Sequence, residues 1–156
     1  MNQNIHKYFA YGSNLSTQQM KERCESALFF CRASKRGYEI CFPIISKRRE
    51  GKGVASIRQN KNASVEGVVY TLSDSDLLKL DGFEGANYCR KRVFVESPKG
   101  KLLVWVYISK IDHGDFFAPS ENYLNTIIYG AWEHRLNKNY IDCLSKLKIN
   151  KIIVTK

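Results

Sequence analysis

The sequence has no long hydrophobic run, and this absence excludes a membrane-spanning helix. No segment approaches the ~18 unbroken apolar residues that such a helix requires, so we expect no membrane partner. The first residues, Met1 to Lys7, are mostly polar and lead directly into a strand-like stretch, without the apolar segment of a secretory signal. We therefore expect a soluble, cytoplasmic protein.

Cysteine and histidine are few and scattered. The five cysteines are an odd number without a C-x-x-C pair, which argues against both a disulfide framework and a zinc site. The three histidines are far apart and lack metal-ligand spacing. We expect most of the cysteines to be reduced core residues and no structural metal to be bound. The residues concerned are Cys24, Cys31, Cys41, Cys89 and Cys143, and His6, His113 and His134.

Internal repeats, linkers and low-complexity segments are also lacking. With 156 residues, 44% of them hydrophobic, the chain is long enough to bury one core. We therefore expect a single domain over residues 1–156, with a basic end at residues 148–156.

The formal net charge of +10 raises the alternative of a polyanionic partner such as a nucleic acid. The densest basic runs are Lys47–Arg49, with Lys52 nearby, and Arg90–Arg92. Neither run has the interleaved aromatic residues of a single-strand binder. Solvated charge that keeps the protein in solution is therefore favoured over nucleic-acid binding.

Runs of β-branched and aromatic residues predict strands, and glycines and short polar stretches separate most of them. Because few helices intervene, a regular alternation of strands and helices around a parallel sheet is not expected. An α+β fold with a curled sheet fits better. The expected strands are Tyr8–Tyr11, Tyr38–Phe42, Val54–Ile57, Val65–Thr71, Val93–Val95 and Leu102–Ile108.

Capping residues and apolar periodicity predict the helices. Ser16 followed by Gln19 forms a capping box that begins a helix ending near Cys24. Ser73 begins a second helix, for which Asp81 and Gly82 predict the end.

The longest expected helix follows Pro119, with Ser120 as its N-cap. Its apolar residues recur with helical spacing at Leu124, Ile127, Ile128, Ala131 and Trp132, so this face should pack on the sheet. A last short helix is expected around Ile141, Leu144 and Leu147, and Ile152–Val154 could add an edge strand.

The stretch Tyr8–Leu15 is a strand that breaks at Gly12 and Ser13 before the helix capped at Ser16. Such a break leaves backbone N–H groups free to bind a carboxylate, a phosphate or a developing oxyanion. The alternative is an ordinary turn, in which Gly12 supplies backbone freedom and Ser13 and Asn14 cap the helix. These residues alone leave both interpretations open.

Glu84 is expected just beyond the second helix, next to Gly85. The partial negative charge of a helix C-terminus and the aromatic neighbours Phe83 and Tyr88 should raise the pKa of its carboxyl toward that of a general base. The alternative is a solvent-exposed loop glutamate.

The stretch Tyr8–Ala33, which contains the motif YGSNL, resembles the N-terminal region of the gamma-glutamylcyclotransferase family. Further segments match that family in the same order, and the resemblance spans residues 5–147. These segments are Gly53–Ile57, Gly67–Tyr70, Leu80–Gly85 with Tyr88, Pro119–Leu124 and Gly130–Glu133.

The resemblance implies a small mixed β-barrel of about five to seven strands flanked by a few helices. It implies that Glu84 is the catalytic acid/base and that Tyr123 reaches the substrate from the long helix. Backbone amides of the implied substrate cradle would hold the glutamyl carboxylate or carbonyl. That cradle consists of Tyr8, Phe9, Ala10, Tyr11, Gly12 and Ser13.

The implied reaction closes a gamma-glutamyl amide into 5-oxoproline and releases an amino acid or amine. The nucleophile is the substrate's own α-amine, so no cofactor is expected. Glu84 would take a proton from this amine, whose free pKa is near 8, and give one to the leaving nitrogen. We expect a small gamma-glutamyl compound as the partner, and a homodimer is left open.

The chain departs from the family at His134–Asn137, where a glycine, a leucine and a proline are usual. This departure predicts a longer helix and an altered pocket rim. The net charge predicts that acidic or neutral leaving amino acids are preferred over a lysine isopeptide. Two other classes stay open: a catalytically silent module that binds gamma-glutamyl or carboxylate groups, and a basic nucleic-acid-associated protein.

Overall fold

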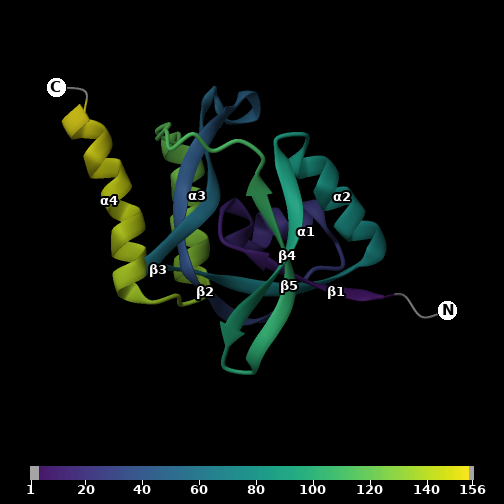
Figure 1. Ribbon diagram of the computed structural model, residues 1–156. Helices are drawn as coiled ribbons and strands as arrows, with labels where there is room; N and C mark the ends of the chain where they lie inside the picture. Colours follow the sequence, from purple (N-terminus) through teal and green to yellow (C-terminus); the bar gives the residue numbers. More distant parts are fainter. Residues whose placement is uncertain (1–3, 155–156) are drawn as a thin grey trace.

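The structure is a computed structural model that describes the backbone of residues 4–154 and the side chains of residues 4–147. Its centre is a closed barrel with the strand order β1-β3-β2-β4-β5 (Figure 1). Strand β1 (Ile5–Ala10) pairs antiparallel with β3 (Lys52–Ser73) and parallel with β5 (Gly100–Ser109). This mixed closure confirms the predicted α+β fold with a mixed barrel.

Two long strands form most of the barrel wall. Strand β2 (Leu28–Ser46) and β3 are joined by a turn that contains the 3₁₀ helix η2 (Lys47–Arg49). Irregularities in their pairing, for example between Cys41 and Ile44, let such long strands bend around the barrel. The remaining hairpin consists of β4 (Tyr88–Ser97) and β5.

The expected strands all lie in these five, but their limits differ. Val54–Ile57 and Val65–Thr71 belong to the one strand β3, in which Arg58, Gln59 and Ser64 between them still pair with β2 across an irregularity in the register. The first half of β2, from Leu28, was not predicted as a strand.

The predicted N-caps are confirmed, but the predicted capping box is not complete, because the Gln19 side chain bonds to Ser13 and Asn14 and the N–H of Ser16 donates to the Ser13 carbonyl. Before α1 (Thr17–Arg23), the Ser16 hydroxyl accepts a hydrogen bond from the N–H of Gln19 at 3.3 Å. Before α3 (Glu121–Glu133), the Ser120 hydroxyl accepts from the N–H of Tyr123 at 3.2 Å.

Helix α2 (Asp74–Glu84) is capped by Ser73 as predicted, but its predicted end is wrong. The helix continues through Gly82, at a cost of about 1 kcal/mol relative to alanine, and ends at Gly85, whose φ of 74° favours glycine. Glu84 is therefore the last residue of a helix and does not lie in a loop beyond it.

Helix α4 (Lys138–Val154) includes residues 152–154, so the predicted edge strand is wrong. Its sequence contains neither glycine nor proline to end the helix early. The prediction of a longer α3 is also wrong, because that helix ends at Glu133 and Arg135 takes a left-handed conformation with φ of 56°.

The helices cover the barrel on two sides. Helices α3 and α4 lie side by side, and α2 lies on the opposite side (Figure 1). Gly130 of α3 packs directly on the 3₁₀ helix η1 (Ser13–Leu15). If residue 130 had a side chain, its Cβ atom would lie only 2.5 Å from the backbone of Leu15, which is too close. This close approach fixes α3, and with it Tyr123, against the turn that follows β1.

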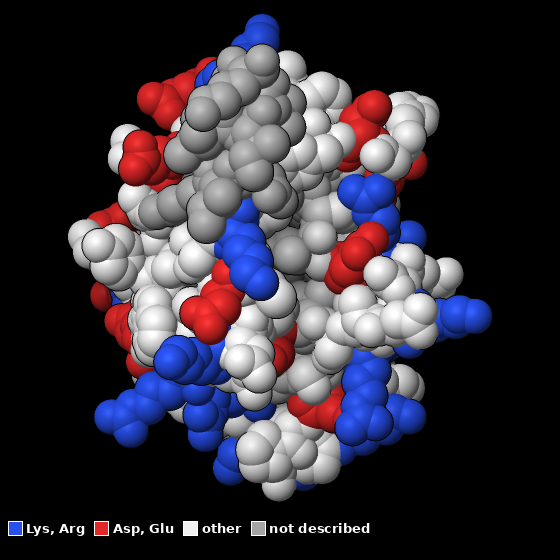
Figure 2. All heavy atoms as spheres, turned by 90° about the vertical axis from the view of Figure 1, so that its left-hand side faces the viewer, with Lys and Arg blue, Asp and Glu red and all other residues white. Residues whose placement is uncertain are grey.

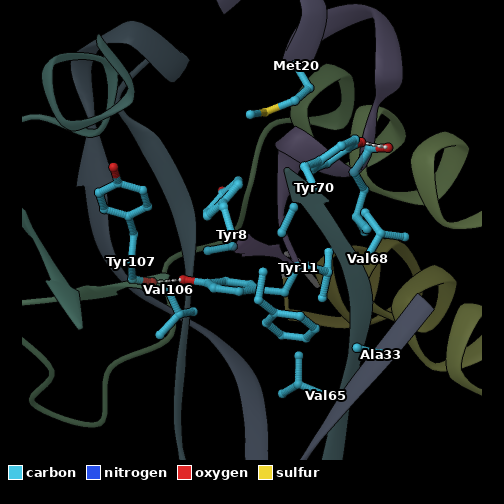
Figure 3. Packing of buried hydrophobic residues seen from close by; sticks show 14 of the residues in the cluster. Tyr8, Tyr11, Met20, Ala33, Val65, Val68, Tyr70, Val106 and Tyr107 are labelled. Atoms are coloured by element: carbon cyan, nitrogen blue, oxygen red, sulfur yellow. Dashed lines mark hydrogen bonds between the residues drawn. The ribbon is translucent and has the colours of Figure 1, made fainter. Parts of the chain in front are cut away.

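The core contains the aromatic and aliphatic side chains of the barrel strands. Figure 3 shows Tyr8, Tyr11 and Tyr107 converging there from β1, the turn after it and β5. All five cysteines are free, and Cys24, Cys31 and Cys41 are buried. Among the described residues, no helix has the length and apolar character needed to cross a membrane.

Basic and acidic side chains are interspersed on the surface. On the face that carries α4, Lys and Arg gather toward the lower edge, with Asp and Glu among them (Figure 2). Ion pairs such as Arg36 with Glu96 at 3.1 Å and Arg58 with Asp112 at 3.5 Å balance individual basic side chains locally and leave the net charge unchanged.

Candidate active site

A cavity of about 100 Å³ lies where the turn after β1, the end of α2, the η2 turn and the start of α3 meet. It brings together segments that are far apart in the sequence. Its lining consists of Tyr8, Tyr11, Gly12, Ser13, Asn14, Arg23, Ser46, Arg48, Arg49, Val54, Ala55, Phe83, Glu84, Asn87, Tyr88, Tyr107 and Tyr123.

Most of the predicted site residues line this cavity, and two do not. Glu84 and Tyr123 lie there together with Tyr8, Tyr11, Gly12 and Ser13. Phe9 and Ala10 are fully buried and pair with β3, so they support the wall without facing the cavity.

The turn at Gly12 and Ser13 has the free donors that the sequence suggested. The carbonyl groups of both residues accept hydrogen bonds, from Leu15 and Ser16, as η1 begins. Within residues 4–154, their own N–H groups donate to no protein acceptor, as is usual for the first residues of a helical turn. A Cβ atom at Gly12 would lie 3.8 Å from the Tyr123 hydroxyl, so the glycine keeps this side of the cavity open.

The carboxyl group of Glu84 has a raised pKa. Burial raises the pKa of Glu84 to about 7, and the positive charges of Arg23, Arg49 and Arg48 offset part of this effect. The pKa of Glu84 is shifted upward, as the sequence predicted, but the largest cause is burial of the carboxyl group. Glu84 is therefore divided between its acid and base forms near neutral pH, as a group that both takes and gives a proton requires.

Asn14 connects Glu84 to the rest of the site. Its Nδ2 donates to the Tyr8 hydroxyl at 3.0 Å and lies 3.4 Å from Oε1 of Glu84. Its Oδ1 accepts from Gln19 at 2.9 Å and from Arg23 at 3.2 Å, which fixes the orientation of the amide. Sequence reasoning missed Asn14 as a site residue, although it belongs to the YGSNL motif.

Buried tyrosines form the walls of the cavity. The Tyr123 hydroxyl accepts from the N–H of Ala55 at 2.9 Å, so its own proton is available to another acceptor. Burial raises the pKa of Tyr123 to about 12, which keeps this hydroxyl protonated at neutral pH. Tyr88 donates to the carbonyl of Ala55 at 2.6 Å, and Tyr11 donates to the carbonyl of Tyr107 at 2.5 Å (Figure 3).

The departure at His134–Asn137 does not reach the cavity. None of these residues lines it. The His134 ring stacks on Phe29 at 5.2 Å and lies 3.2 Å from the Thr17 hydroxyl. Among the described residues, no group of three or more His, Cys, Asp or Glu side chains is placed to hold a metal ion.

Both the sequence and the fold match known proteins. Residues 8–134 match the model of the family described as gamma-glutamyl cyclotransferase, AIG2-like. The chain belongs to the gamma-glutamyl cyclotransferase family. The family resemblance seen in the YGSNL motif and the segments after it is thereby confirmed.

Relatives of this family cover most of the chain. Gamma-glutamylcyclotransferase from Homo sapiens is 32% identical over 153 residues, which is 92% of this chain and 79% of that protein. The protein of the same name from Mus musculus is 31% identical over 151 residues, with the same coverage. A solved gamma-glutamyl cyclotransferase structure has a TM-score of 0.84 at 31% identity and covers 91% of this chain and 87% of its own. The chain is therefore an enzyme of the gamma-glutamyl cyclotransferase type.

Proposed function

We propose that this gamma-glutamyl cyclotransferase converts a gamma-glutamyl amide into 5-oxoproline and releases the attached amino acid or amine. The observation that supports this most strongly is the setting of Glu84. Its carboxyl, with a pKa of about 7, lines the same cavity as the free N–H groups of Gly12 and Ser13. A proton carrier and oxyanion donors are the two elements that an intramolecular acyl transfer needs.

The reaction begins with the substrate's α-amine. This nitrogen attacks the δ-carbonyl carbon, a C–N bond forms and closes a five-membered ring, and the carbonyl oxygen becomes an oxyanion. Glu84 in its carboxylate form takes the proton that the amine loses. The amine belongs to the same molecule as the carbonyl, so its attack does not require a second reactant.

The second step breaks the original amide bond. The electron pair of the oxyanion re-forms the carbonyl, the C–N bond to the leaving group breaks, and Glu84 returns its proton to the leaving nitrogen. Water is not consumed, and Glu84 ends in the state in which it began. Its pKa near 7 suits both transfers, because neither protonation state is strongly disfavoured at neutral pH.

The oxyanion between the two steps would be stabilised by the N–H groups of Gly12 and Ser13. Donors of this kind contribute on the order of 3 kcal/mol each in comparable sites. The Tyr123 hydroxyl, which keeps its proton while it accepts from Ala55, is a third donor on the same side of the cavity.

Incubation with a panel of gamma-glutamyl compounds tests this function. Mass detection should find 5-oxoproline and the free amine in equal amounts, and reactions run in ¹⁸O-labelled water should leave both products unlabelled. Free glutamate carrying ¹⁸O would instead indicate hydrolysis, and no product from any compound would overturn the proposal.

A further inference from the structure

Three arginines line the cavity, and the proposed chemistry uses none of them. Arg23 is the last residue of α1, and Arg48 and Arg49 belong to η2. Within the described part of the chain, none of the three forms an ion pair with a carboxylate. Their positive charges therefore face the cavity without a paired anion of the protein.

Arg49 packs against an aromatic wall of the cavity. It is half-buried, and its guanidinium lies 4.9 Å from the centre of the Tyr123 ring. Its Nη2 donates to Oε1 of Gln19 at 3.1 Å. A guanidinium has five N–H donors, and a partly desolvated cation is costly unless an anion or other acceptors satisfy it.

Arg48 lies beside the proposed reacting centre but is exposed to solvent. Its Nη1 donates to the carbonyl of Phe83 at 3.1 Å, next to Glu84 in the chain. Arg23 differs from both, because its Nη1 bonds to Asn14 and its guanidinium lies 5.2 Å from the Phe83 ring. Arg23 thus orients the site, whereas Arg48 and Arg49 line the cavity from the η2 turn.

The charge of the cavity lining exceeds what a gamma-glutamyl group alone requires. The lining has three arginines and one carboxyl, Glu84, so it stays positive even when Glu84 is ionised. A gamma-glutamyl group has one carboxylate and one amine. The leaving nitrogen must lie at Glu84 to receive a proton, and Arg48 and Arg49 line the same cavity, with Arg48 bonded to the carbonyl of Phe83 next to Glu84.

We propose that Arg48 and Arg49 bind carboxylate groups of the leaving amino acid and so determine which substrates are favoured. This inference rests on the proposed function. A guanidinium binds a carboxylate through two parallel hydrogen bonds, a geometry that an amide or an ammonium cannot reproduce. The enzyme then favours a dicarboxylic leaving amino acid over a monocarboxylic one, and both over an amine without a carboxylate.

Three substrates with different leaving groups test the subsite. The compounds are gamma-glutamyl-glutamate, gamma-glutamyl-alanine and gamma-glutamyl-ethylamide, whose leaving group has no carboxylate. We expect kcat/KM to fall in this order. The assays are run at pH 9, because both arginines lower the pKa of Glu84 and at this pH its carboxyl is ionised in the parent and in the variants alike. In Arg48→Gln and Arg49→Gln, we then expect kcat/KM for the first two compounds to fall about tenfold through KM, while that for the ethylamide changes less than about twofold.

Control variants separate binding from structure and from net charge. Arg92→Gln removes the same charge from an exposed residue over the Trp105 ring, outside the cavity, and should leave the order and the ratios unchanged. Arg49→Lys keeps the charge but not the paired donors, and should recover only part of the preference. The inference would be overturned if kcat/KM fell equally for all three compounds. It would also be overturned if the ratios of kcat/KM between the compounds were unchanged in the double variant Arg48→Gln/Arg49→Gln.

Calorimetric binding of the three compounds to Glu84→Gln tests the subsite without turnover. If Glu84→Gln prefers the dicarboxylic compound and this preference disappears when Arg48→Gln and Arg49→Gln are added to it, the arginine subsite is supported. This holds even if the parent forms no 5-oxoproline, in which case only the proposed reaction fails. Equal binding of all three compounds, with 5-oxoproline still formed by the parent, overturns the subsite and leaves the reaction standing.

Discussion

Nδ2 of Asn14 lies 3.4 Å from Oε1 of Glu84, and this contact connects the turn after β1 to the end of α2. The amide is held in this orientation because both donors to its oxygen, Gln19 and Arg23, come from α1. The position of the carboxyl group therefore depends on the whole N-terminal segment as well as on its own helix.

The first prediction concerns the pH dependence of turnover. The base form of Glu84 is needed to begin the reaction, and burial raises the pKa of Glu84 to about 7. We expect kcat/KM to rise as pH increases through about 7. Initial rates of 5-oxoproline formation from pH 5 to 9 would measure this, and a midpoint near 4.5, the ordinary value, would contradict it.

Asn14→Ala should move that midpoint. The Asn14 amide donates to the carboxylate, which favours the ionised form, so its removal should raise the pKa of Glu84 further. We expect the midpoint of the pH profile to shift upward and kcat/KM at pH 7 to fall at least about tenfold. Asn122→Ala, outside the cavity lining on α3, is the matched control. A lower rate with an unmoved midpoint would show that Asn14 acts only through the fold.

Tyr123→Phe should reduce turnover and leave the fold intact. The substitution removes the hydroxyl that accepts from the N–H of Ala55 and the proton that we assign to the substrate. We expect kcat/KM to fall about 10- to 100-fold and stability to fall by about 1–3 kcal/mol, because the Ala55 N–H loses its acceptor. Tyr129→Phe, on the same helix with a 72% exposed side chain, should change neither quantity.

Glu84 should also destabilise the folded protein at alkaline pH. Its pKa is raised from 4.5 to about 7 on folding, so between these values the folded state binds more protons than the unfolded state, and stability falls as pH rises. Glu84→Gln removes this loss and should be more stable than the parent at pH 8, by on the order of 3 kcal/mol. The difference between the two proteins should be smaller by that amount at pH 4. Urea unfolding at both pH values measures it, and an equal difference at both would contradict the assigned cause.

Local signals in the sequence were sufficient for much of this structure. Ser16, Ser73 and Ser120 cap their helices by accepting from an N–H three residues later, so the helix starts are encoded within one turn. The end of α2 was not predicted correctly because Gly82 and Gly85 are both acceptable helix ends by composition.

Long-range relations explain the other misses. The polar stretch between the two halves of β3 separates two expected strands, but both halves belong to one strand because Arg58, Gln59 and Ser64 pair with β2. Glu84, Tyr123 and the YGSNL motif were recognised by family resemblance, whereas Arg48 and Arg49 read only as part of a basic run. Their place at the cavity depends on how the β2–β3 turn folds back onto the end of α2, which no local pattern contains.

The kcat of Glu84→Gln tests the central claim most directly. Glutamine keeps the shape of the side chain but cannot carry the proton, so we expect 5-oxoproline formation to slow at least ~100-fold, while the variant still binds substrate and still unfolds cooperatively. Glu121→Gln, in the exposed first turn of α3, should behave as the parent. Turnover by Glu84→Gln within a few-fold of the parent would contradict the account, because the proton would then have to pass through another group.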